Sequence, residues 1–301
     1  MTPSPSRTPL KRLLDVPAPA KLNLFLHITG RRADGYHLLQ SVFMLIDWCD
    51  TLQFELRHDG AISREDLTPT QLPAEDLTVR AARLLQKATG CTLGAHIGLE
   101  KNLPAEAGMG GGSSDAATCL LALNRMWGLG LTRSQLASLG LQLGADVPFF
   151  IGGRNAWVEG VGEQLTPMPL AAARFVVVKP PGGASTQSIF KSPDLKRDTK
   201  PAIIQGFAAY DADDPLKHSI QSVLESGQND LQPVAQALCP DIGHCISWLE
   251  SHGLHGRMTG SGTAVFAQMR QFHNLSDAPS NWLVRNCKNM DAHPLLDWCS
   301  G

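Results

Sequence analysis

The predicted fold depends on one stretch, Lys101-Asn102-Leu103-Pro104-Ala105-Glu106-Ala107-Gly108-Met109-Gly110-Gly111-Gly112-Ser113-Ser114-Asp115-Ala116-Ala117. Apolar residues then recur at helical spacing as far as Gly128, which predicts a helix directly after the glycines. Glycines before a helix let the backbone approach a ligand, and the free N–H groups and dipole of the helix favour an anion there. Ser113, Ser114 and Asp115 stand where caps and first-turn anions belong. The stretch therefore predicts a phosphate-binding loop.

A flexible loop tip is the alternative interpretation of the same glycines. Each glycine costs roughly 0.5–1 kcal/mol of extra backbone entropy, so the four between 108 and 112 cost about 2–4 kcal/mol. A tight turn needs one or two such residues, which favours the phosphate-binding interpretation. The loop is not of the Walker A type, because no Gly-Lys-Ser/Thr closes it. It also differs from the dinucleotide-binding fingerprint, because Gly-Gly-Ser-Ser follows the first glycine spacing.

Composition limits the protein class. A chain of 301 residues predicts two domains or one large one. The net charge of −2 excludes nucleic-acid binding by bulk charge. The seven cysteines are scattered without a Cys-x-x-Cys pair, which is typical of a reducing compartment. No apolar run reaches the roughly 18 residues of a membrane span. We therefore expect a cytoplasmic protein with neither a nucleic-acid nor a membrane partner.

Two candidate functional side chains lie on the first predicted strand, residues 18–30. Alternation places Lys21 and Asn23 on one face, about 7 Å apart along the strand. A strand lysine is usually a solvated residue or an edge protector, so this pattern alone does not assign a function. Tyr36 follows the turn at 31–35, where its ring is either a stacking platform for a planar ligand or part of a packed turn.

Later segments supply helices, strands and one aspartate. Residues 41–47, 52–56 and 93–101 are predicted strands, and a helix runs from a cap at Glu75-Asp76 to Gly90. A capping box at 132–135 begins a helix that ends at Gly144. Asp146 then lies on a turn before a predicted apolar strand, and Pro148 helps to make this turn rigid. The aspartate is either an ordinary cap or a functional group, since an idle carboxylate among apolar residues is costly.

The second half begins with a predicted buried strand at 174–179 and a short helix at 185–190. Residues 194–215 form a predicted loop, and helices follow around 217–226 and 231–251. A Gly-Ser-Gly turn at 260–262 between two strands is either a tight hairpin or a further anion site.

Five ordered segments together resemble the GHMP small-molecule kinases: Pro-Ala-Lys-Leu-Asn-Leu at 19–24, the stretch 104–117, Gly-Ala-Asp-Val-Pro-Phe at 144–149, Asn-Asp-Leu at 229–231 and Met-Thr-Gly-Ser-Gly at 258–262. Gly35-Tyr36-His37 and the triple glycine resemble the branch of that family that acts on a cytidylyl-linked methylerythritol. The resemblance covers about residues 17–267. It implies an α+β fold of two domains with the active site in the cleft between them. The first is a ribosomal-protein-S5-domain-2-like α/β domain at 17–172 and the second a ferredoxin-like α+β domain at 173–301, after a disordered tail at 1–16.

The resemblance also implies an activity and its residues. The γ-phosphoryl of ATP would pass, with Mg2+, to the 2-hydroxyl of the methylerythritol unit, a step of non-mevalonate isoprenoid synthesis. Asp146 matches the family's catalytic aspartate and Lys21 its partner lysine, while residues 104–114 match the segment that wraps the ATP phosphates. The remaining residues implied at the nucleotide are Lys101, Asp76 and Leu77, and those implied at the substrate are Asn23, Tyr36, His37, Phe43, Thr186 and Phe190.

The implied chemistry agrees with the residue types. Phosphoryl transfer depends mainly on positioning and charge stabilisation. Asp146 would accept or orient the hydroxyl proton, and Lys21 would keep that carboxylate ionised. Tyr36 and Phe190 would stack on the cytosine of a small-molecule substrate. The alternatives are another GHMP kinase, acting on homoserine, mevalonate or a sugar, and a nucleotide-binding protein without catalysis. We expect a monomer or a weak homodimer, and the choice of magnesium ligand between carboxylates and hydroxyls stays open.

Overall fold

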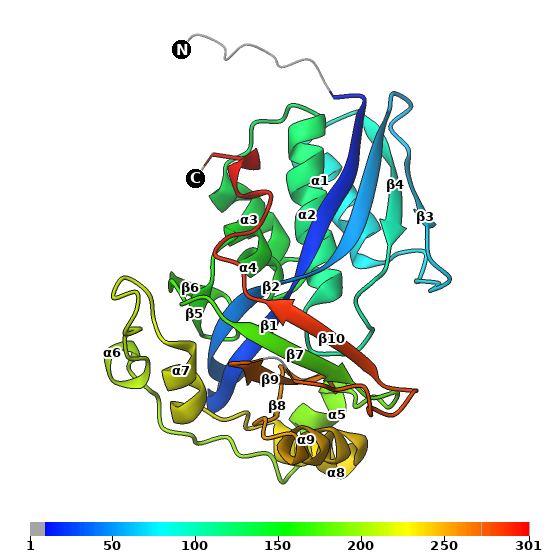
Figure 1. The fold of residues 1–301 in the computed structure, drawn as a ribbon. Coiled ribbons are helices and arrows are strands. Elements are labelled where there is room, and N and C mark those ends of the chain that lie inside the picture. Colours follow the sequence, from blue (N-terminus) through cyan, green and yellow to red (C-terminus); the bar gives the residue numbers. More distant parts are fainter. Residues whose placement is uncertain (1–9, 272, 301) are drawn as a thin grey trace.

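A computed structural model describes residues 10–271 and 273–300 of the chain. Within this part, the strands form a six-stranded sheet and a four-stranded sheet, which Figure 1 shows as the upper and lower parts of the molecule. Four helices pack on the first sheet, and five short helices lie around the second. The predicted α+β class with two domains is confirmed.

The first sheet is built on a long antiparallel ribbon of β1 (Arg12–Arg31) and β2 (His37–Arg57). The other strands are β3 (Ile62–Asp66), β4 (Gly94–Glu100), β5 (Ala156–Glu159) and β6 (Gln164–Pro167), in the order β3-β4-β2-β5-β6 with β1 paired to β2. The strands predicted at 41–47 and 52–56 are therefore one continuous strand. Their intervening polar residues do not interrupt it, because β2 has partners on both sides.

The N-terminal tail is shorter than predicted. Residues 1–9 lie outside the described part of the chain. Residues 12–16, which we assigned to the tail, belong to β1, where Arg12 pairs with Glu55 and Val16 with Leu52. Val16 is buried in the first core, which gives this end of the strand an apolar anchor.

Alternation along β1 separates an apolar face from a polar one. Ala20, Leu22 and Leu24 pack into a core against the second sheet, so Lys21 and Asn23 face the other way. The predicted alternation fails at Phe25, which is also buried in that core. The pairing with β2 shifts register between Asn23 and Leu26, and such an irregularity turns consecutive side chains to one face.

The helices of the first domain are α1 (Leu77–Thr89), α2 (Gly111–Met126), α3 (Arg133–Leu141) and α4 (Val147–Gly152). Asp76 caps α1, Gly90 ends it in the left-handed conformation, and the capping box at Thr132 is present, all as predicted. The prediction of a strand at 147–150 is wrong, because these residues form α4. Pro148 lies in the first helical turn, where proline is tolerated, and a short apolar run does not distinguish a helix from a strand.

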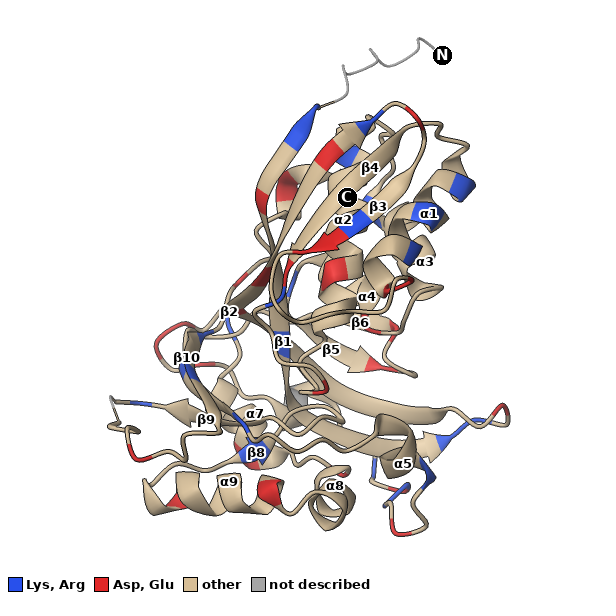
Figure 2. Ribbon diagram, turned by 90° about the vertical axis from the view of Figure 1, so that its right-hand side faces the viewer, with Lys and Arg blue, Asp and Glu red and all other residues tan. Residues whose placement is uncertain are grey.

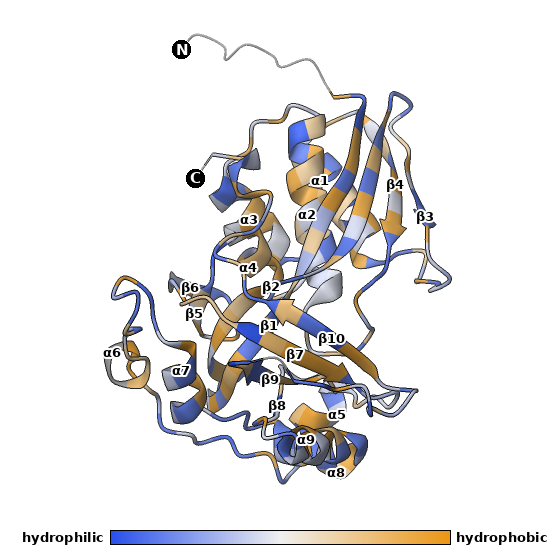
Figure 3. Ribbon diagram, in the orientation of Figure 1, coloured by the Kyte–Doolittle hydropathy of each residue, from blue (hydrophilic) through white to orange (hydrophobic). Residues whose placement is uncertain are grey.

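The second sheet has the order β10-β7-β9-β8, from β7 (Arg174–Lys179), β8 (Arg257–Met258), β9 (Val265–Met269) and β10 (Leu283–Lys288). β7, whose residues 175–178 are buried, appears largely orange in Figure 3. The helices of this part are α5 (Thr186–Lys191), α6 (Ile204–Phe207), α7 (Ile220–Ser226), α8 (Gln232–Leu238) and α9 (Asp241–Ser251). The helix predicted over 231–251 is divided at Cys239 and Pro240.

The end of the described chain returns to the first domain. After β10, the amide of Met290 donates to Leu45 O at 2.9 Å, and that of His293 donates to Gly153 O at 2.9 Å. A short 3-10 turn, Leu296–Trp298, follows, and Leu295 is buried in the first core. Residues 289–300, which we assigned to the C-terminal domain, therefore pack with the N-terminal one.

Charged residues are mixed over the surface. Figure 2 shows blue Lys and Arg segments next to red Asp and Glu segments, in keeping with a net charge of −2. Among the helices of the described residues, none is both apolar and long enough to cross a membrane.

Candidate active site

The glycine stretch forms the N-terminus of α2. Its N-cap is Gly110, which is left-handed at φ 71° and makes no side-chain cap bond. The amide of Ser114 is bonded to Gly110 O, so the amides of residues 111–113 precede the helix's own hydrogen-bond ladder. Three N–H groups and the positive end of the helix dipole therefore lie together, which is the arrangement that binds an anion.

The serines and the aspartate do not cap α2 as predicted. The helix begins earlier, at Gly111, so these residues lie inside its first turns. Ser114 Oγ donates to Pro19 O at 2.7 Å, and Asp115 accepts from Lys101. The Ser113 hydroxyl lies near Gly144, two residues before Asp146, since a Cβ added at Gly144 would lie 3.8 Å from Ser113 Oγ.

Two glycine turns, at 108–112 and 260–262, are in close contact at the start of α2. A Cβ on Gly108, which is left-handed at φ 76°, would lie 2.1 Å from Thr259 O, and one on Gly262 would lie 1.9 Å from Gly108 N. The loop is also bonded to the first strand, because Lys21 N donates to Met109 O at 3.0 Å. Gly262 thus serves close packing between the two domains, which is a structural reason for the second glycine turn.

Lys21 and Asp146 face each other beside the loop. Lys21 Nζ lies 3.6 Å from Asp146 Oδ2, with the lysine side chain 4% and the aspartate side chain 31% exposed. Burial lowers the pKa of Lys21, and the Asp146 carboxylate opposes that shift. Asp146 is the N-cap residue of α4 but makes no cap bond, so its carboxylate is not used by its own helix. The ammonium also donates to Asn23 Oδ1 and lies 4.7 Å from the centroid of the Phe43 ring.

One cavity of about 750 Å³ opens at this pair. It brings together each residue that the sequence analysis placed in catalysis or at the substrate: Lys21, Asn23, Tyr36, His37, Phe43, Asp146, Thr186 and Phe190. Both domains contribute, since Thr186 and Phe190 lie on α5 and the others precede residue 173. The His37 and Phe190 rings are 5.0 Å apart, whereas Tyr36 is 65% exposed at the rim.

Comparisons with known proteins agree with this geometry. Residues 76–154 match the family model of the GHMP kinases N-terminal domain, and residues 217–278 match that of the GHMP kinases C-terminal domain. The chain is 65% identical, over 98% of its length and 99% of the relative's, to a protein of Polaromonas naphthalenivorans named 4-diphosphocytidyl-2-C-methyl-D-erythritol kinase. This chain belongs to the 4-diphosphocytidyl-2-C-methyl-D-erythritol kinase family of GHMP kinases.

Solved structures show the same fold. A crystal structure of 4-(cytidine 5'-diphospho)-2C-methyl-D-erythritol kinase superimposes with a TM-score of 0.72 at 29% identity, over 92% of this chain and 98% of that one. The homoserine kinase of Cytophaga hutchinsonii superimposes with a TM-score of 0.68 at 15% identity, over 95% and 97% of the two chains. At 15% identity, the homoserine kinase shares only the GHMP fold with this chain.

Two of the three residues predicted near adenine have other partners in this GHMP fold. Lys101 Nζ is bonded to Asp115 Oδ2 at 2.7 Å and to buried Asp50, whose other oxygen accepts from the amides of Asn102 and Leu103. Asp76 accepts from Val79 N and pairs with Arg64 Nη1 at 3.0 Å. Lys101 and Asp76 are therefore held by other protein groups, in a structural role next to the glycine stretch.

Leu77 is the third of those residues. A Cβ on Gly112 would lie 3.5 Å from Leu77 Cδ1, so this side chain flanks the start of α2. An apolar side chain beside the phosphate-binding amides is in a position to contact a nucleotide base.

Sequence reasoning missed several groups around the cavity. Thr259 Oγ1 accepts from Asn23 N at 2.9 Å, Ser261 Oγ lies 2.8 Å from Thr186 Oγ1, and Arg197 Nε donates to His37 Nε2 at 3.0 Å. Thr259 and Ser261 belong to the Met-Thr-Gly-Ser-Gly motif, so that motif was a signal for them. Arg197 lies in the segment interpreted as a weakly patterned loop, where no signal marked it.

No cluster of three or more His, Cys, Asp or Glu side chains with metal-binding geometry occurs at residues 10–271 and 273–300. The Ser113 hydroxyl, within the glycine stretch, and the Asp146 carboxylate, opposite Lys21, are hard oxygen donors. Both are of the type that Mg2+ binds.

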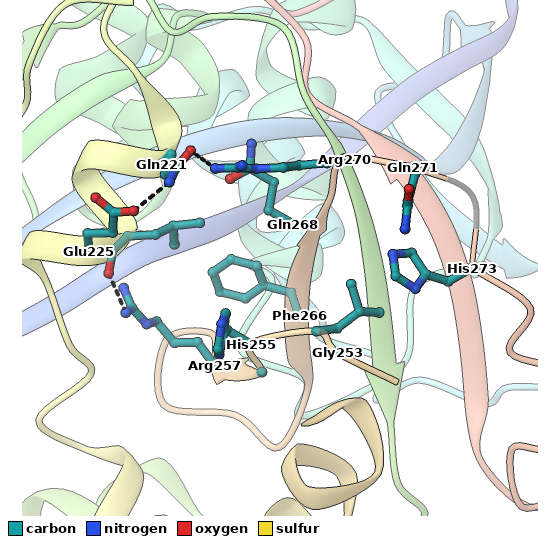
Figure 4. Close-up of a pocket in the computed structure, with 13 residues that line it drawn as sticks. Gln221, Glu225, Gly253, His255, Arg257, Phe266, Gln268, Arg270, Gln271 and His273 are labelled. Carbon is teal, nitrogen blue, oxygen red and sulfur yellow. Dashed lines mark hydrogen bonds between the residues drawn. The ribbon is translucent and has the colours of Figure 1, made fainter. Parts of the chain in front are cut away.

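A second cavity, of about 780 Å³, lies in the C-terminal domain between α7 and the strands β8 and β9 (Figure 4). Its polar side chains bind one another and the backbone: Arg270 donates to Gln221 Oε1, and Arg257 donates to Leu224 O and Leu24 O. It contains none of the residues predicted for the site. We therefore assign the candidate active site to the cleft around Lys21 and Asp146.

Proposed function

We propose that this chain transfers the γ-phosphoryl group of ATP to the 2-hydroxyl of 4-diphosphocytidyl-2-C-methyl-D-erythritol, in the biosynthesis of isoprenoid precursors. One observation carries the proposal. The Lys21–Asp146 pair lies at 3.6 Å in the same cavity as Tyr36, His37 and Phe190, and a Cβ on Gly110, the N-cap of α2, would lie 3.4 Å from Lys21 Cε. The acid–ammonium pair and the aromatic rings suited to a nucleobase thus share one cavity, and the N-terminus of α2 lies next to the lysine.

ATP would bind with its phosphates at residues 104–114. The amides of residues 111–113 would hold the β- and γ-phosphates, and a bound Mg2+ would neutralise their charge. The Ser113 hydroxyl would supply an oxygen ligand to that ion. Leu77 would contact the nucleotide at the start of α2.

The acceptor alcohol would bind between Lys21 and Asp146. Asp146 orients the 2-hydroxyl and takes its proton as the oxygen bonds to the γ-phosphorus and the bond to the leaving β-phosphate oxygen breaks. Lys21 stabilises the ionised carboxylate and the charge on the transferred group. Buried beside Asn23 and Phe43, its ammonium has little freedom, so the pair is already oriented before substrate binds.

The cytidine would bind at the outer end of the cavity. Tyr36 and Phe190 would stack on the cytosine ring, and His37 and Thr186 would offer polar contacts, while Asn23 would lie beside Lys21 near the acceptor alcohol. Residue types on this wall favour a planar nucleobase over a small acceptor such as homoserine or mevalonate, which has no ring to stack. All seven cysteines are free, which supports a cytoplasmic location.

Competing acceptors test the proposal directly. ATP is supplied with equal concentrations of 4-diphosphocytidyl-2-C-methyl-D-erythritol, homoserine or mevalonate, and ADP release is measured. We expect turnover with the cytidylyl substrate to exceed that with either of the others by about a thousandfold or more. Comparable turnover with homoserine or mevalonate contradicts the proposed substrate and favours another GHMP kinase activity.

A further inference from the structure

Arg197 connects two walls of the substrate cavity. Its Nε donates to His37 Nε2 at 3.0 Å, at the start of β2. Its Nη2 donates to the carbonyls of Phe190 and Ser192, at 3.0 and 2.7 Å, at the end of α5. A single guanidinium thus fixes His37 from the first domain against the helix that carries Phe190. The planar fork of arginine is suited to such a set of simultaneous bonds, and lysine is not.

The segment that carries Arg197 is itself held in place. Thr199 N donates to Ile28 O at 3.0 Å, and Thr199 Oγ1 donates to Asp230 Oδ2 at 2.7 Å. The same carboxylate oxygen accepts from Ile28 N at 2.8 Å. Leu195, two residues before Arg197, is buried in the core of the second domain. The segment is therefore held on both sides of Arg197, by Leu195 before it and Thr199 after it, and this positions Arg197 next to His37.

The contact determines the protonation of His37. A guanidinium has only N–H donors, so His37 Nε2 must be the acceptor and the ring proton must lie on Nδ1. Nδ1 has no hydrogen-bond partner among the described residues, and the ring lines the cavity. His37 therefore has one N–H left for a ligand.

The charges around the ring support the neutral form. Burial, Arg197 and Arg31 each lower the pKa of His37. Asp34 and Lys191 also line this cavity, and they offer one charge of each sign. At neutral pH the imidazole is thus an uncharged donor.

We propose that Arg197 determines which pyrimidine the cavity accepts, by holding His37 as the neutral Nδ1–H tautomer. This inference rests on the proposed function. Cytosine offers two acceptors on its pairing edge, N3 and O2, whereas uracil carries a proton on N3. An N–H donor that faces N3 favours cytosine and opposes uracil, because a donor facing the N3 proton of uracil leaves both without a partner, whereas O2 accepts in both bases. Arg197 is a positioning residue, since it acts through His37.

Kinetics with matched variants test this role. Arg197→Met removes every donor, Arg197→Lys keeps the charge on a single donor nitrogen, and Lys196→Met removes a charge from the exposed neighbouring residue as a control. We expect Arg197→Met to raise the KM of the cytidylyl substrate about tenfold or more and to reduce its preference over the uridylyl analogue by a similar factor. The KM of ATP should stay within about twofold, since no ATP contact is lost. Arg197→Lys should restore part of the preference, and Lys196→Met should match wild type.

Two kinetic results overturn the role of Arg197. One is an unchanged preference between the cytidylyl and uridylyl substrates in Arg197→Met while the wild type turns over normally. The other is an equal rise in the KM values of ATP and the cytidylyl substrate. A wild-type protein that does not phosphorylate the cytidylyl substrate overturns instead the proposed function, and with it the assignment of the base.

Nitrogen-15 NMR of the imidazole tests the tautomer without any turnover, with the His37 signals assigned by their loss in His37→Gln. We expect the wild-type ring to be protonated at Nδ1, and Arg197→Met to raise its pKa and to mix the two tautomers. A wild-type ring protonated at Nε2, or an Arg197→Met ring with unchanged signals, overturns the inference.

Discussion

Tyr36 and Tyr210 are the two tyrosines of the chain, and both side chains are largely exposed, at 65% and 64%. Tyr36 lies at the rim of the substrate cavity, whereas Tyr210 stacks on His218 with ring centroids 4.5 Å apart. We expect Tyr36→Ala to raise the KM of the cytidylyl substrate about tenfold, because stacking contributes about 1–3 kcal/mol per base. The KM of ATP should not change. Steady-state kinetics of Tyr36→Ala and of the control Tyr210→Ala decide the point.

Equal losses for ATP and the cytidylyl substrate in Tyr36→Ala contradict a stacking role for Tyr36. A comparable effect of Tyr210→Ala contradicts it as well, because that ring lies outside the cavity.

Asp115 makes stability depend on pH. Burial raises the pKa of its carboxyl from 3.8 to about 7, although Lys101 opposes the shift. The folded chain then binds this proton more tightly than the unfolded chain, so the free energy of unfolding falls as the pH rises between those values. Because asparagine does not titrate, we expect the free energy of unfolding of Asp115→Asn relative to wild type to rise by about 2 kcal/mol from pH 5 to pH 8. Urea unfolding at the two pH values measures this difference.

Exposed Asp198 provides the control for that measurement, since Asp198→Asn should follow wild type at both pH values. If the stability of Asp115→Asn relative to wild type is the same at pH 5 and pH 8, the pKa of Asp115 is not raised into this range, and the prediction is wrong.

The proposed phosphate site depends on the two glycine turns, at 108–112 and 260–262. Gly108 and Gly90 are both left-handed, but only at Gly108 would a Cβ strike another backbone, 2.1 Å from Thr259 O. We expect Gly90→Ala to cost about 1 kcal/mol of unfolding free energy, which is the strain of the left-handed conformation, and to leave the KM of ATP unchanged. Gly108→Ala should cost more than about 2 kcal/mol and raise that KM. Thermal unfolding and steady-state kinetics of both variants measure these effects.

A Gly108→Ala variant with the stability and ATP affinity of Gly90→Ala contradicts this account. The two turns would then not need their close contact.

Local signals predicted elements well where a cap or a turn carried them. Asp76, Gly90 and the Thr132 capping box fixed the ends of α1 and the start of α3. Apolar runs were less informative, because Val147–Phe150 has the composition of a strand and forms α4. The start of α2 was also misplaced. Its cap is Gly110, where the backbone conformation and not a side-chain bond begins the helix.

At the scale of the whole molecule, the return of residues 289–300 ties the two domains together. Leu295 is 2% exposed in the first core, and Leu238 at the end of α8 is 51% exposed. We expect Leu295→Ala to lower the free energy of unfolding by about 2–4 kcal/mol, as for other buried leucines. Leu238→Ala should change it by less than about 0.5 kcal/mol. Denaturant unfolding of both variants tests the difference, and similar values contradict the packing of this segment.

The sequence alone could not predict the contacts that connect distant segments. The residues of the candidate site came from the family resemblance, and their distances and their common cavity came from the fold. The contact between Arg197 and His37 joins residues 160 positions apart, and nothing local to either marks it. The return of residues 289–300 is similar, because its partners at Leu45 and Gly153 lie far back in the chain.

We propose above that the Lys21–Asp146 pair performs phosphoryl transfer beside the N-terminus of α2. The most direct test is single-turnover transfer from ATP to the cytidylyl substrate by Asp146→Asn, with the binding of both ligands measured by calorimetry on the same protein. We predict that the transfer rate falls about a thousandfold, as expected for a lost general base, while both dissociation constants stay within about threefold of wild type. A transfer rate equal to that of wild type, with both ligands bound, contradicts the claim.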